Sequence, residues 1–272
     1  MLHLAWRRQI KNLLNSGMPA GPRGLGTSEL LDQDLIIDAR YNVLDVPERN
    51  LNYRFMVAEW VWMMFGRSDV ESLAQFNSVM REFSDDGVWL TGAYGPHIKA
   101  QRADVRAKLR KDPNTRQAVI EILRPRRETK DEPCTLSFQF LLRDGRLNMI
   151  ATMRSSDVWL GIPYDVFTFT MLLNCMAGEL GVERGWLSLR SGSLHLYNRD
   201  DNKAKTVLTC DAGTTLRTPP LPGFPPHWLE DVLLKRDSSF IARDYQDDPW
   251  LPYAEVLLSS TSNAARDILR RV

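Results

Sequence analysis

The segment Arg154-Ser-Ser-Asp157-Val-Trp-Leu-Gly161-Ile-Pro-Tyr-Asp165 is the most informative stretch of this sequence. A single thiol precedes it, in Glu132-Pro-Cys134-Thr. Together the two segments supply a cysteine, an arginine–serine pair that suits a phosphate, and two carboxylates. These are groups that are needed to hold a nucleotide and to attack its base covalently. A lone cysteine is more often a small buried apolar residue than a nucleophile, so it is the charged neighbours that favour a catalytic role.

The composition is that of an ordinary globular protein of 272 residues, with 43% hydrophobic and 25% charged residues. A net charge of +1 argues against binding to nucleic acid or to an anionic membrane, because such partners require a basic face. Three cysteines, an odd number, favour a reducing compartment over a disulfide framework. The N-terminus lacks the apolar core of a signal peptide, and no run of about 18 apolar residues would span a membrane. We expect a cytoplasmic protein, in the host cytoplasm if the chain is viral.

Hydrophobic periodicity predicts helices and strands along the whole chain. Helices are expected at 3–17, 51–67, 69–84, 103–109 and 164–180, with Asn50 capping the second. Strands are expected at 34–38, 119–123, 136–142, 147–153, 186–191 and 194–197, with a hairpin turn at Asp144-Gly145. After a proline-rich segment at 219–226, the pattern indicates a short α/β region and an amphipathic basic helix at 264–272. The expected fold is a single α/β domain over residues 1–272, with a mixed sheet and buried helices.

Several motifs together resemble the thymidylate synthase superfamily over nearly the full length of the chain. Cys134, Gln139-Phe, Asp144-Gly and the segment 154–165 are similar to the central block of that family. Further pieces follow in the family's order: Arg23 in a Gly-rich loop, Glu59 in Glu-Trp-Val-Trp, Tyr94-Gly95, Arg116 in Asp-Pro-Asn-Thr-Arg, and His195-Leu-Tyr197. The resemblance implies a thymidylate synthase-like fold, with a large mixed β-sheet, buried helices and a homodimer formed through the sheet faces.

The departures from the synthase pattern point to one branch of the superfamily. Synthases carry His after the nucleophile, Gln before the Arg-Ser pair and Asn after the Gly-x-Pro motif, where this chain has Thr135, Met153 and Asp165. The segment Gly192-Ser-Leu-His also replaces the synthases' Gly-Asp-Thr-His. These features look like the phage deoxycytidylate hydroxymethylases, which convert dCMP to 5-hydroxymethyl-dCMP. The resemblance therefore implies dCMP as the preferred substrate and 5,10-methylenetetrahydrofolate as the co-substrate, without a metal.

The acid at position 165 also has a physical interpretation. Uracil presents an N3–H donor and an O4 acceptor, which an amide can satisfy. Cytosine reverses this polarity, and a carboxylate can accept from its amino group while a shared proton completes the bond to N3. A mispaired base would leave buried polar groups unsatisfied, at about 1–3 kcal/mol each. The alternative is structural, because Asp165 could simply cap a helix that begins at Val166.

The resemblance assigns a role to each candidate site residue. Cys134 would add to C6 of the base, helped by arginines that favour the thiolate. Glu59 would order water and relay protons, and Tyr94 would assist removal of the C5 proton. The other assignments are phosphate binding by Arg23, Arg154, Ser155 and the second subunit's copy of Arg116; folate binding by Asp157 and Gly161; and sugar binding by His195 and Tyr197. Gln117 stands where the synthases have a second arginine, which puts one phosphate contact in doubt.

Each assignment has a structural alternative. Glu59 could be a satisfied buried carboxylate, Tyr94 could anchor a turn, and His195 and Tyr197 could be ordinary core residues. Trp60, Trp62, Met171 and Met176 are expected to be packing residues.

The product depends on whether water or hydride reaches the activated base. Met80 and Phe83 stand near the positions where synthases place tryptophans, and the basic tail does not resemble their apolar C-terminal lid. A site that excludes water less well favours hydroxymethyl over methyl. Alternatives are hydroxymethylation of CMP, methylation of dCMP, action on dUMP, or a non-catalytic nucleotide-binding paralogue. Phage DNA modification and nucleoside-antibiotic synthesis would both use this chemistry.

Overall fold

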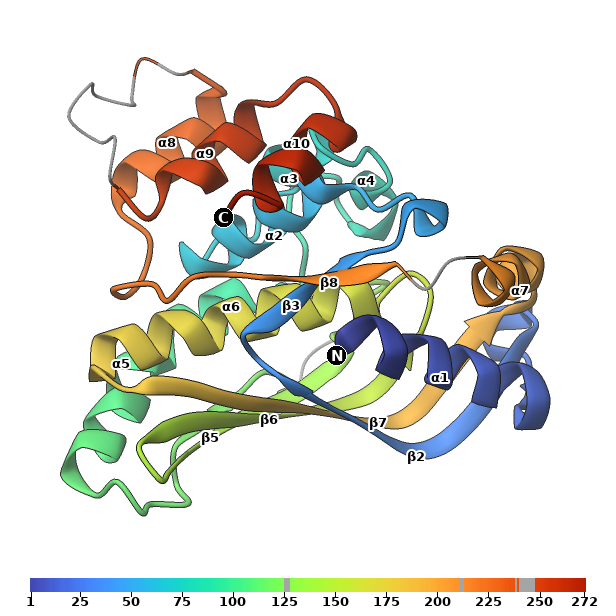
Figure 1. The fold of residues 1–272 in the computed structure, drawn as a ribbon, viewed down its shortest axis with the longest axis horizontal. Coiled ribbons are helices and arrows are strands. Elements are labelled where there is room, and N and C mark those ends of the chain that lie inside the picture. Colours follow the sequence, from blue (N-terminus) through green and yellow to red (C-terminus); the bar gives the residue numbers. More distant parts are fainter. Residues whose placement is uncertain (125–127, 211–212, 238, 240–247) are drawn as a thin grey trace.

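The computed structural model describes residues 1–124, 128–210, 213–237, 239 and 248–272. A six-stranded mixed sheet forms its base, in the order β1-β2-β7-β6-β5-β4 (Figure 1). Its strands are β1 (Met18–Ala20), β2 (Thr27–Asp38), β4 (Val119–Glu121), β5 (Thr135–Arg143), β6 (Arg146–Asp157) and β7 (Glu183–Tyr197). β6 and β7 run parallel, and the other neighbours are antiparallel. The predicted mixed sheet is therefore confirmed. A separate pair, β3 (Tyr41–Asp45) and β8 (Thr214–Arg217), lies above it.

The hairpin between β5 and β6 forms where the sequence predicts it. Asp144 and Gly145 both have positive φ, at 51° and 70°. A two-residue turn with left-handed φ at both positions matches the twist of antiparallel strands, and Gly adopts that conformation at low cost. The register set by this hairpin holds from the Arg143–Arg146 pair to the Ser137–Thr152 pair, and a one-residue shift beyond it places Thr135 opposite Met153.

The segments 186–191 and 194–197 belong to one continuous strand, β7, and not to two sheet elements. Gly192 lies inside this strand, opposite Arg154 on β6. A Cβ at this position would lie 3.0 Å from the carbonyl oxygen of Arg154. The glycine therefore marks close approach of two strands, a role that the sequence pattern cannot distinguish from a turn.

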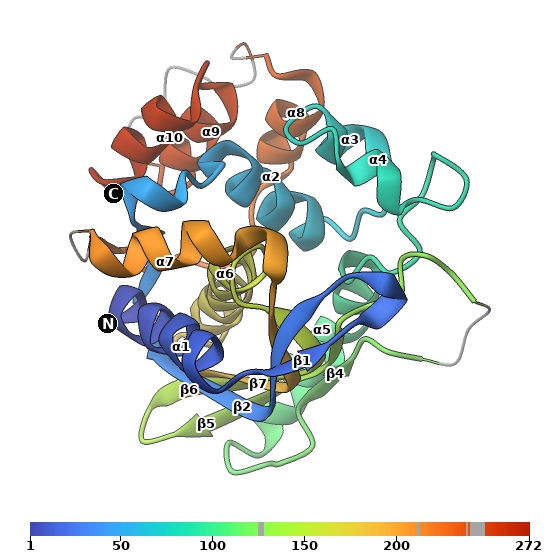
Figure 2. The ribbon, with the colours of Figure 1, turned by 90° about the vertical axis from the view of Figure 1, so that its right-hand side faces the viewer.

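Helices cover one face of the sheet in two layers (Figures 1 and 2). The helices are α1 (Leu2–Ser16), α2 (Tyr53–Met64), α3 (Val70–Ala74), α4 (Met80–Phe83), α5 (Gly95–Lys111), α6 (Ile162–Leu180), α7 (Asp201–Thr209), α8 (His227–Lys235), α9 (Leu251–Leu258) and α10 (Ser262–Leu269). α6 connects the parallel strands β6 and β7 and lies directly on the sheet, and α2 lies above α6.

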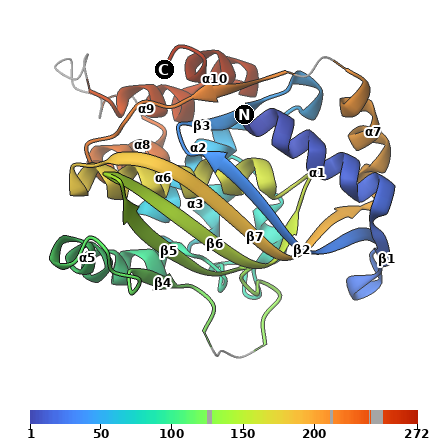
Figure 3. The same ribbon diagram turned by 60° about the horizontal axis from the view of Figure 1, so that its bottom comes forward.

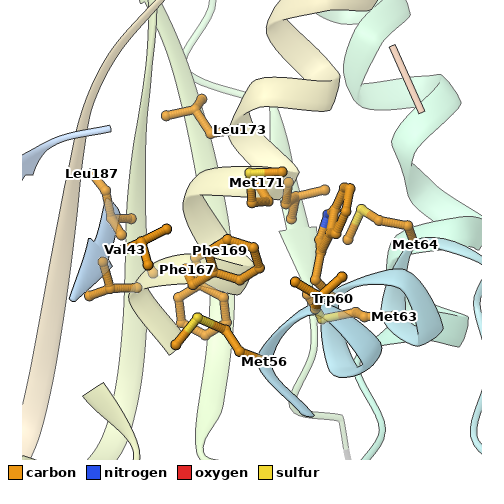
Figure 4. Packing of buried hydrophobic residues seen from close by; sticks show 14 of the residues in the cluster. Val43, Met56, Trp60, Met63, Met64, Phe167, Phe169, Met171, Leu173 and Leu187 are labelled. Atoms are coloured by element: carbon orange, nitrogen blue, oxygen red, sulfur yellow. The ribbon is translucent and has the colours of Figure 1, made fainter. Parts of the chain in front are cut away.

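The main core lies between α2, α6 and the sheet. Both helices are apolar around most of their circumference, as expected for helices buried on all sides. Figure 4 shows Phe167 and Phe169 of α6 between Leu187 of β7 and Trp60 of α2. α2 begins at the side chain of Asn52, which accepts a hydrogen bond from the Phe55 amide, so the predicted cap at Asn50 is wrong.

Three other expectations for the helices differ from the structure. The region 69–84 forms two short helices, because Asn77 follows the first and accepts from the Val79 amide. α5 starts at Gly95 and not at 103, because Pro96 suits a first helical turn. After the proline-rich segment, the described residues form helices α8 to α10 and no strand. The amphipathic tail helix is confirmed.

The C-terminal helices are tied to the rest of the fold. The buried carboxylate of Asp45 on β3 accepts from Arg266 and, at 2.9 Å, from Nε of Arg270. Ser262 Oγ donates to the Leu51 carbonyl at 2.6 Å and accepts from the Tyr53 amide at 3.0 Å. α10 thus satisfies an amide in the first turn of α2, which otherwise lacks an intrahelical partner.

The opposite face of the sheet carries no helix in the described part of the chain (Figure 3). Ile36 on β2 is 61% exposed there, and Trp186, paired with Asp38 beside it, is 37% exposed. None of the described helices is long and apolar enough to cross a membrane.

Candidate active site

A cavity of about 170 Å³ lies where the start of β5, the first turns of α6 and the middle of α2 meet. Its wall combines four carboxyl groups, one thiol, two other polar side chains and an apolar remainder. The residues are Glu59, Trp62, Met63, Leu73, Met80, Leu90, Gly92, Ala93, Tyr94, Asp131, Glu132, Pro133, Cys134, Asp165, Thr168 and Phe169. Four predicted site residues, Glu59, Tyr94, Cys134 and Asp165, therefore share one cavity.

Cys134 lies directly before β5, and its thiol is partly buried in the cavity wall. The Arg154 amide donates to its carbonyl at 2.8 Å, and Ser155 Oγ lies 3.8 Å from its Sγ. Burial raises the pKa of the thiol, although Arg154 and the Ser155 hydrogen bond both lower it. The expectation that arginine favours the thiolate is thus right in direction, but burial outweighs it.

Arg154 braces the loop that carries the thiol. Its Nε donates to the Pro133 carbonyl at 3.0 Å, and one terminal nitrogen donates to the Glu132 carbonyl at 2.9 Å. The other terminal nitrogen donates to Ser155 Oγ at 3.3 Å. The guanidinium remains exposed. Arg154 and Ser155 therefore form an adjacent, hydrogen-bonded pair beside Cys134.

Glu59 projects from α2 into the cavity among apolar side chains, including Trp62 and Met63. Burial raises the pKa of its carboxyl group to about 7. No described group forms a hydrogen bond or ion pair with it, unlike the satisfied carboxylate that a structural role would require. A carboxyl group with a pKa near neutrality can both accept and return a proton at physiological pH.

Asp165 lies in the first turn of α6, but it does not cap that helix. α6 begins at Ile162, its N-cap is Gly161, and no side chain caps it. The capping alternative for Asp165 is therefore wrong. Burial, then Glu59, then Asp157 raise the pKa of Asp165 well above its usual range. Gly161 leaves room for the acid, since a Cβ there would lie 3.1 Å from Asp165 Oδ2.

Tyr94 closes the side of the cavity nearest Cys134. Its hydroxyl accepts from the Thr135 amide at 3.3 Å, and its ring packs on Phe138 and Phe169. Burial, with smaller effects from Cys134 and Asp165, raises the pKa of the phenol. Tyr94 is thus a neutral hydroxyl held within reach of the thiol loop.

Asp157 lies at the end of β6, outside the cavity wall. Its Oδ1 accepts from the amides of Trp159 at 2.7 Å and Leu160 at 2.9 Å. Burial raises its pKa, while the opposite residue His195 lowers it. One oxygen therefore shapes the turn into α6.

The remaining predicted residues do not line the cavity. His195 and Tyr197 lie on one face of β7, with ring centroids 5.3 Å apart, and Arg199 stacks over Tyr197. Arg23 is exposed at φ 54° in a short 3₁₀ turn, Pro22–Gly24. Arg116 is exposed, and its carbonyl accepts from Gln139 on β5.

Sequence reasoning missed several wall residues. Trp62, assigned to packing, lines the cavity while its Nε1 donates to the Asp69 carbonyl at 3.0 Å. Asp131 and Glu132 also line it, and Asp131 accepts from the Gly92 amide. Thr168 could have been found, because it follows Asp165 by three residues on a helix and so shares its face. Within the described residues, no three His, Cys, Asp or Glu side chains are grouped as metal ligands would be.

Comparison with known proteins agrees with the fold. Residues 5–222 match the family model described as thymidylate synthase, and the chain belongs to that family. It is 39% identical over 220 residues to a deoxyuridylate hydroxymethyltransferase of Bacillus phage SP01, covering 72% of this chain and 57% of that protein. It is 34% identical over 190 residues to a deoxyuridylate hydroxymethyltransferase of Pseudomonas phage M6, covering 65% and 54%. The chain thus spans little more than half the length of these relatives. α8, α9 and α10 lie beyond the residues matched by the family model.

Proposed function

We propose that this protein is a pyrimidine nucleotide C5 hydroxymethyltransferase that acts on dCMP, with 5,10-methylenetetrahydrofolate and water. The observation that carries the proposal is the convergence of Cys134, Glu59 and Asp165 on one cavity. A thiol, a proton acceptor and a base-recognition acid are the three groups that covalent activation of a pyrimidine requires.

The nucleotide phosphate is assigned to Arg154 and Ser155, which are adjacent and lie beside the thiol. Arg23 is exposed and free to approach the same anion. A phosphate so held leaves the base to enter the cavity, with the sugar toward His195 and Tyr197. Cys134 then forms a bond from Sγ to C6, which makes C5 nucleophilic. Its elevated pKa means that the thiol proton must first pass to a base.

The cavity fits the pterin ring of the folate co-substrate. Trp62, Met80 and Leu90 give it an apolar wall that suits an aromatic ring, and Asp157 lies at the adjacent turn with one oxygen not used by that turn. When bound, the folate supplies a one-carbon unit at the oxidation level of formaldehyde. The protein itself orients C5 of the base toward this carbon, moves protons at Glu59 and holds a water molecule.

The side chains at 80 and 83 favour water as the final nucleophile. Met80 lines the cavity, but Phe83 is 46% exposed. The C-terminal helix is held at Asp45, away from the cavity wall. Among the described residues, no tight apolar cover closes the cavity; a site open to water favours hydroxymethyl as the product.

The identity of the base depends on the proton at Asp165. As a neutral acid, its O–H can donate to N3 of cytosine while its carbonyl accepts from the amino group. The same neutral acid can also donate to O4 of uracil and accept from N3–H. dUMP is therefore the second candidate, and the names of the two phage relatives favour it.

One assay tests the proposal. The protein is incubated with methylenetetrahydrofolate and dCMP, dUMP or CMP labelled with tritium at C5, and the products are identified by mass. Tritium release with a hydroxymethyl product from dCMP supports the proposal. Release from dUMP alone assigns the activity to the second candidate, and a methyl product assigns a methylase. No release from any of the three nucleotides would leave only a binding function.

We also propose that two chains pair through the open sheet face. Ile36 and Trp186 are exposed there, and Arg116 lies beside β5 at the same sheet. Exposed apolar side chains on a large sheet face are typical of a buried homodimer contact. The pairing would bring Arg116 to the phosphate site of the other subunit.

A further inference from the structure

One hydroxyl group in the cavity wall has no partner in the described part of the chain. Thr168 is 3% exposed and lines the cavity, and its Oγ1 makes no hydrogen bond to any described group. A buried hydroxyl without a partner costs about 1–3 kcal/mol. A bound ligand or water molecule is therefore expected at its free hydrogen-bonding position.

Thr170, on the same helix, shows how a purely structural threonine satisfies its hydroxyl. Its Oγ1 donates to the Val166 carbonyl at 2.6 Å and accepts from Asn42 Nδ2 at 2.9 Å. Buried helical threonines usually bond to the carbonyl one turn back in this way. Thr168 has the same helical setting but does not make that bond.

Thr168 shares the cavity wall with two acids, Glu59 and Asp165. Asp165 and Thr168 are three residues apart on α6 and so lie on one face of the helix, and Glu59 lines the cavity from α2. No lysine or arginine lines this cavity among the described residues. A water here would find two or three polar partners, as an ordered buried water needs.

We propose that Thr168 and Glu59 together hold the water that becomes the hydroxyl group of the product, an assignment that rests on the proposed function. One O–H of this water donates to the Glu59 carboxylate and the other donates to Thr168 Oγ1. A lone pair of the water oxygen is then free to form a bond to the methylene carbon on C5.

The step balances without a further reagent. As the C–O bond forms, the water proton passes to Glu59, and the electron pair of the exocyclic double bond moves into the ring. The ring then reforms its C5–C6 double bond and expels the sulfur of Cys134 as thiolate. Thr168 neither gains nor loses a proton, so its contribution is to orient the water.

The test compares T168V, which replaces the hydroxyl with a methyl group of similar size, with T168S, which keeps a hydroxyl. Each variant is assayed for tritium release from C5 and for hydroxymethyl product, in the presence of 2-mercaptoethanol, which traps any methylene carbon that water does not reach. We expect T168V to release tritium but to form about tenfold less hydroxymethyl product per tritium released, with the thiol adduct increased. T168S should restore the ratio to within about twofold.

T170V is the matched control, because it removes a threonine hydroxyl from the same helix that faces Asn42. It should lower the melting temperature but leave the product ratio unchanged. If T168V does not fold, T168A provides the same comparison. A wild-type product ratio in T168V or T168A overturns the role of Thr168 and leaves the proposed function intact. Absence of tritium release from the wild-type protein overturns both.

Discussion

Glu59 on α2 and Asp165 on α6 are half-buried and line the same cavity, whose wall holds no cation among the described residues. Two like charges in such a site cannot both ionise cheaply. Burial raises the pKa of both acids, and repulsion from Glu59 raises that of Asp165 further, which favours a proton on Asp165 for base recognition and proton transfer at Glu59 near neutral pH. This relationship links substrate choice to chemistry, and the expected effects of changing Glu59 and Asp165 follow from it.

Removing the charge of Glu59 should stabilise the protein at high pH. The pKa of Glu59 is about 7 in the folded protein against 4.5 when unperturbed, so the contribution of Glu59 to stability is most favourable below pH 4.5 and is lost as pH rises through 7. At pH 8 the ionised group costs roughly 3 kcal/mol. Urea unfolding should show E59Q more stable than wild type at pH 8 but not at pH 5, with hydroxymethylation abolished. E48Q, at an exposed glutamate, should show neither effect. Equal stability of E59Q and wild type at pH 8 would contradict the burial of this charge.

Replacing Asp165 by asparagine should shift base preference toward uracil. An amide can donate a hydrogen bond to cytosine N3 but cannot transfer a proton to it, as a carboxyl group can when the ring is activated, whereas its amino group donates readily to O4 of uracil. We expect the ratio of kcat/KM for dCMP to that for dUMP to fall about tenfold or more. D104N, at an exposed aspartate of α5, provides the control. An unchanged ratio in D165N would show that the acid does not contact the base.

Arg154 should affect the reactivity of the Cys134 thiol as well as the binding of the nucleotide phosphate. Its charge lowers the pKa of Cys134 and its side chain braces the Glu132 and Pro133 carbonyls. R154A should therefore slow alkylation of Cys134 by iodoacetamide at pH 8 severalfold and raise KM for the nucleotide. Peptide mass mapping distinguishes this thiol from Cys210. R8A serves as the control, since Arg8 is exposed on α1. Faster alkylation in R154A would mean that shielding by the side chain outweighs its charge.

The C-terminal helices should be necessary for stability although they lie outside the family match. Asp45 is fully buried and is paired with Arg266 and Arg270. R266A leaves this carboxylate with one partner and should lower the free energy of unfolding by about 2 kcal/mol. R271A, one residue beyond the pair and exposed, should change it little. Wild-type stability in R266A would show that α10 is not held by this ion pair.

Mixing two inactive variants should test whether Arg116 completes the site of the other subunit in the proposed dimer. C134S and R116A are each expected to be inactive as pure proteins, because one lacks the nucleophile and the other lacks a phosphate contact. If Arg116 acts across the interface, mixing the two should restore up to about a quarter of wild-type activity, since one mixed dimer site is intact. Sedimentation measures the dimer in the same samples. A mixture that stays inactive while dimers form would place Arg116 and Cys134 in sites of the same subunit.

Local pattern was enough to predict most elements of this fold. The turn at Asp144-Gly145, the apolar helix around Phe169 and the hydrophobic strands β5 and β6 each depend on residues near one another in the chain. Boundaries and continuity were less predictable. Gly192 interrupts the hydrophobic pattern of β7, yet the strand continues, because the reason for that glycine is the neighbouring Arg154 carbonyl.

The order of the motifs along the chain was enough to predict the main residues of the candidate site. Cys134, Glu59, Tyr94 and Asp165 do meet in one cavity.

Residue identity and local periodicity thus determined the family, the main helices and strands, and the chemical groups of the site, since these depend on the order of residues along the chain. Packing of α2 against α6 determined how these groups are arranged and what environment surrounds them. It placed Asp165 in a helical turn facing Glu59, left the hydroxyl of Thr168 without a partner among the described residues and raised both acid pKa values. These properties depend on burial and on distances between residues far apart in the chain, and no local pattern contains that information.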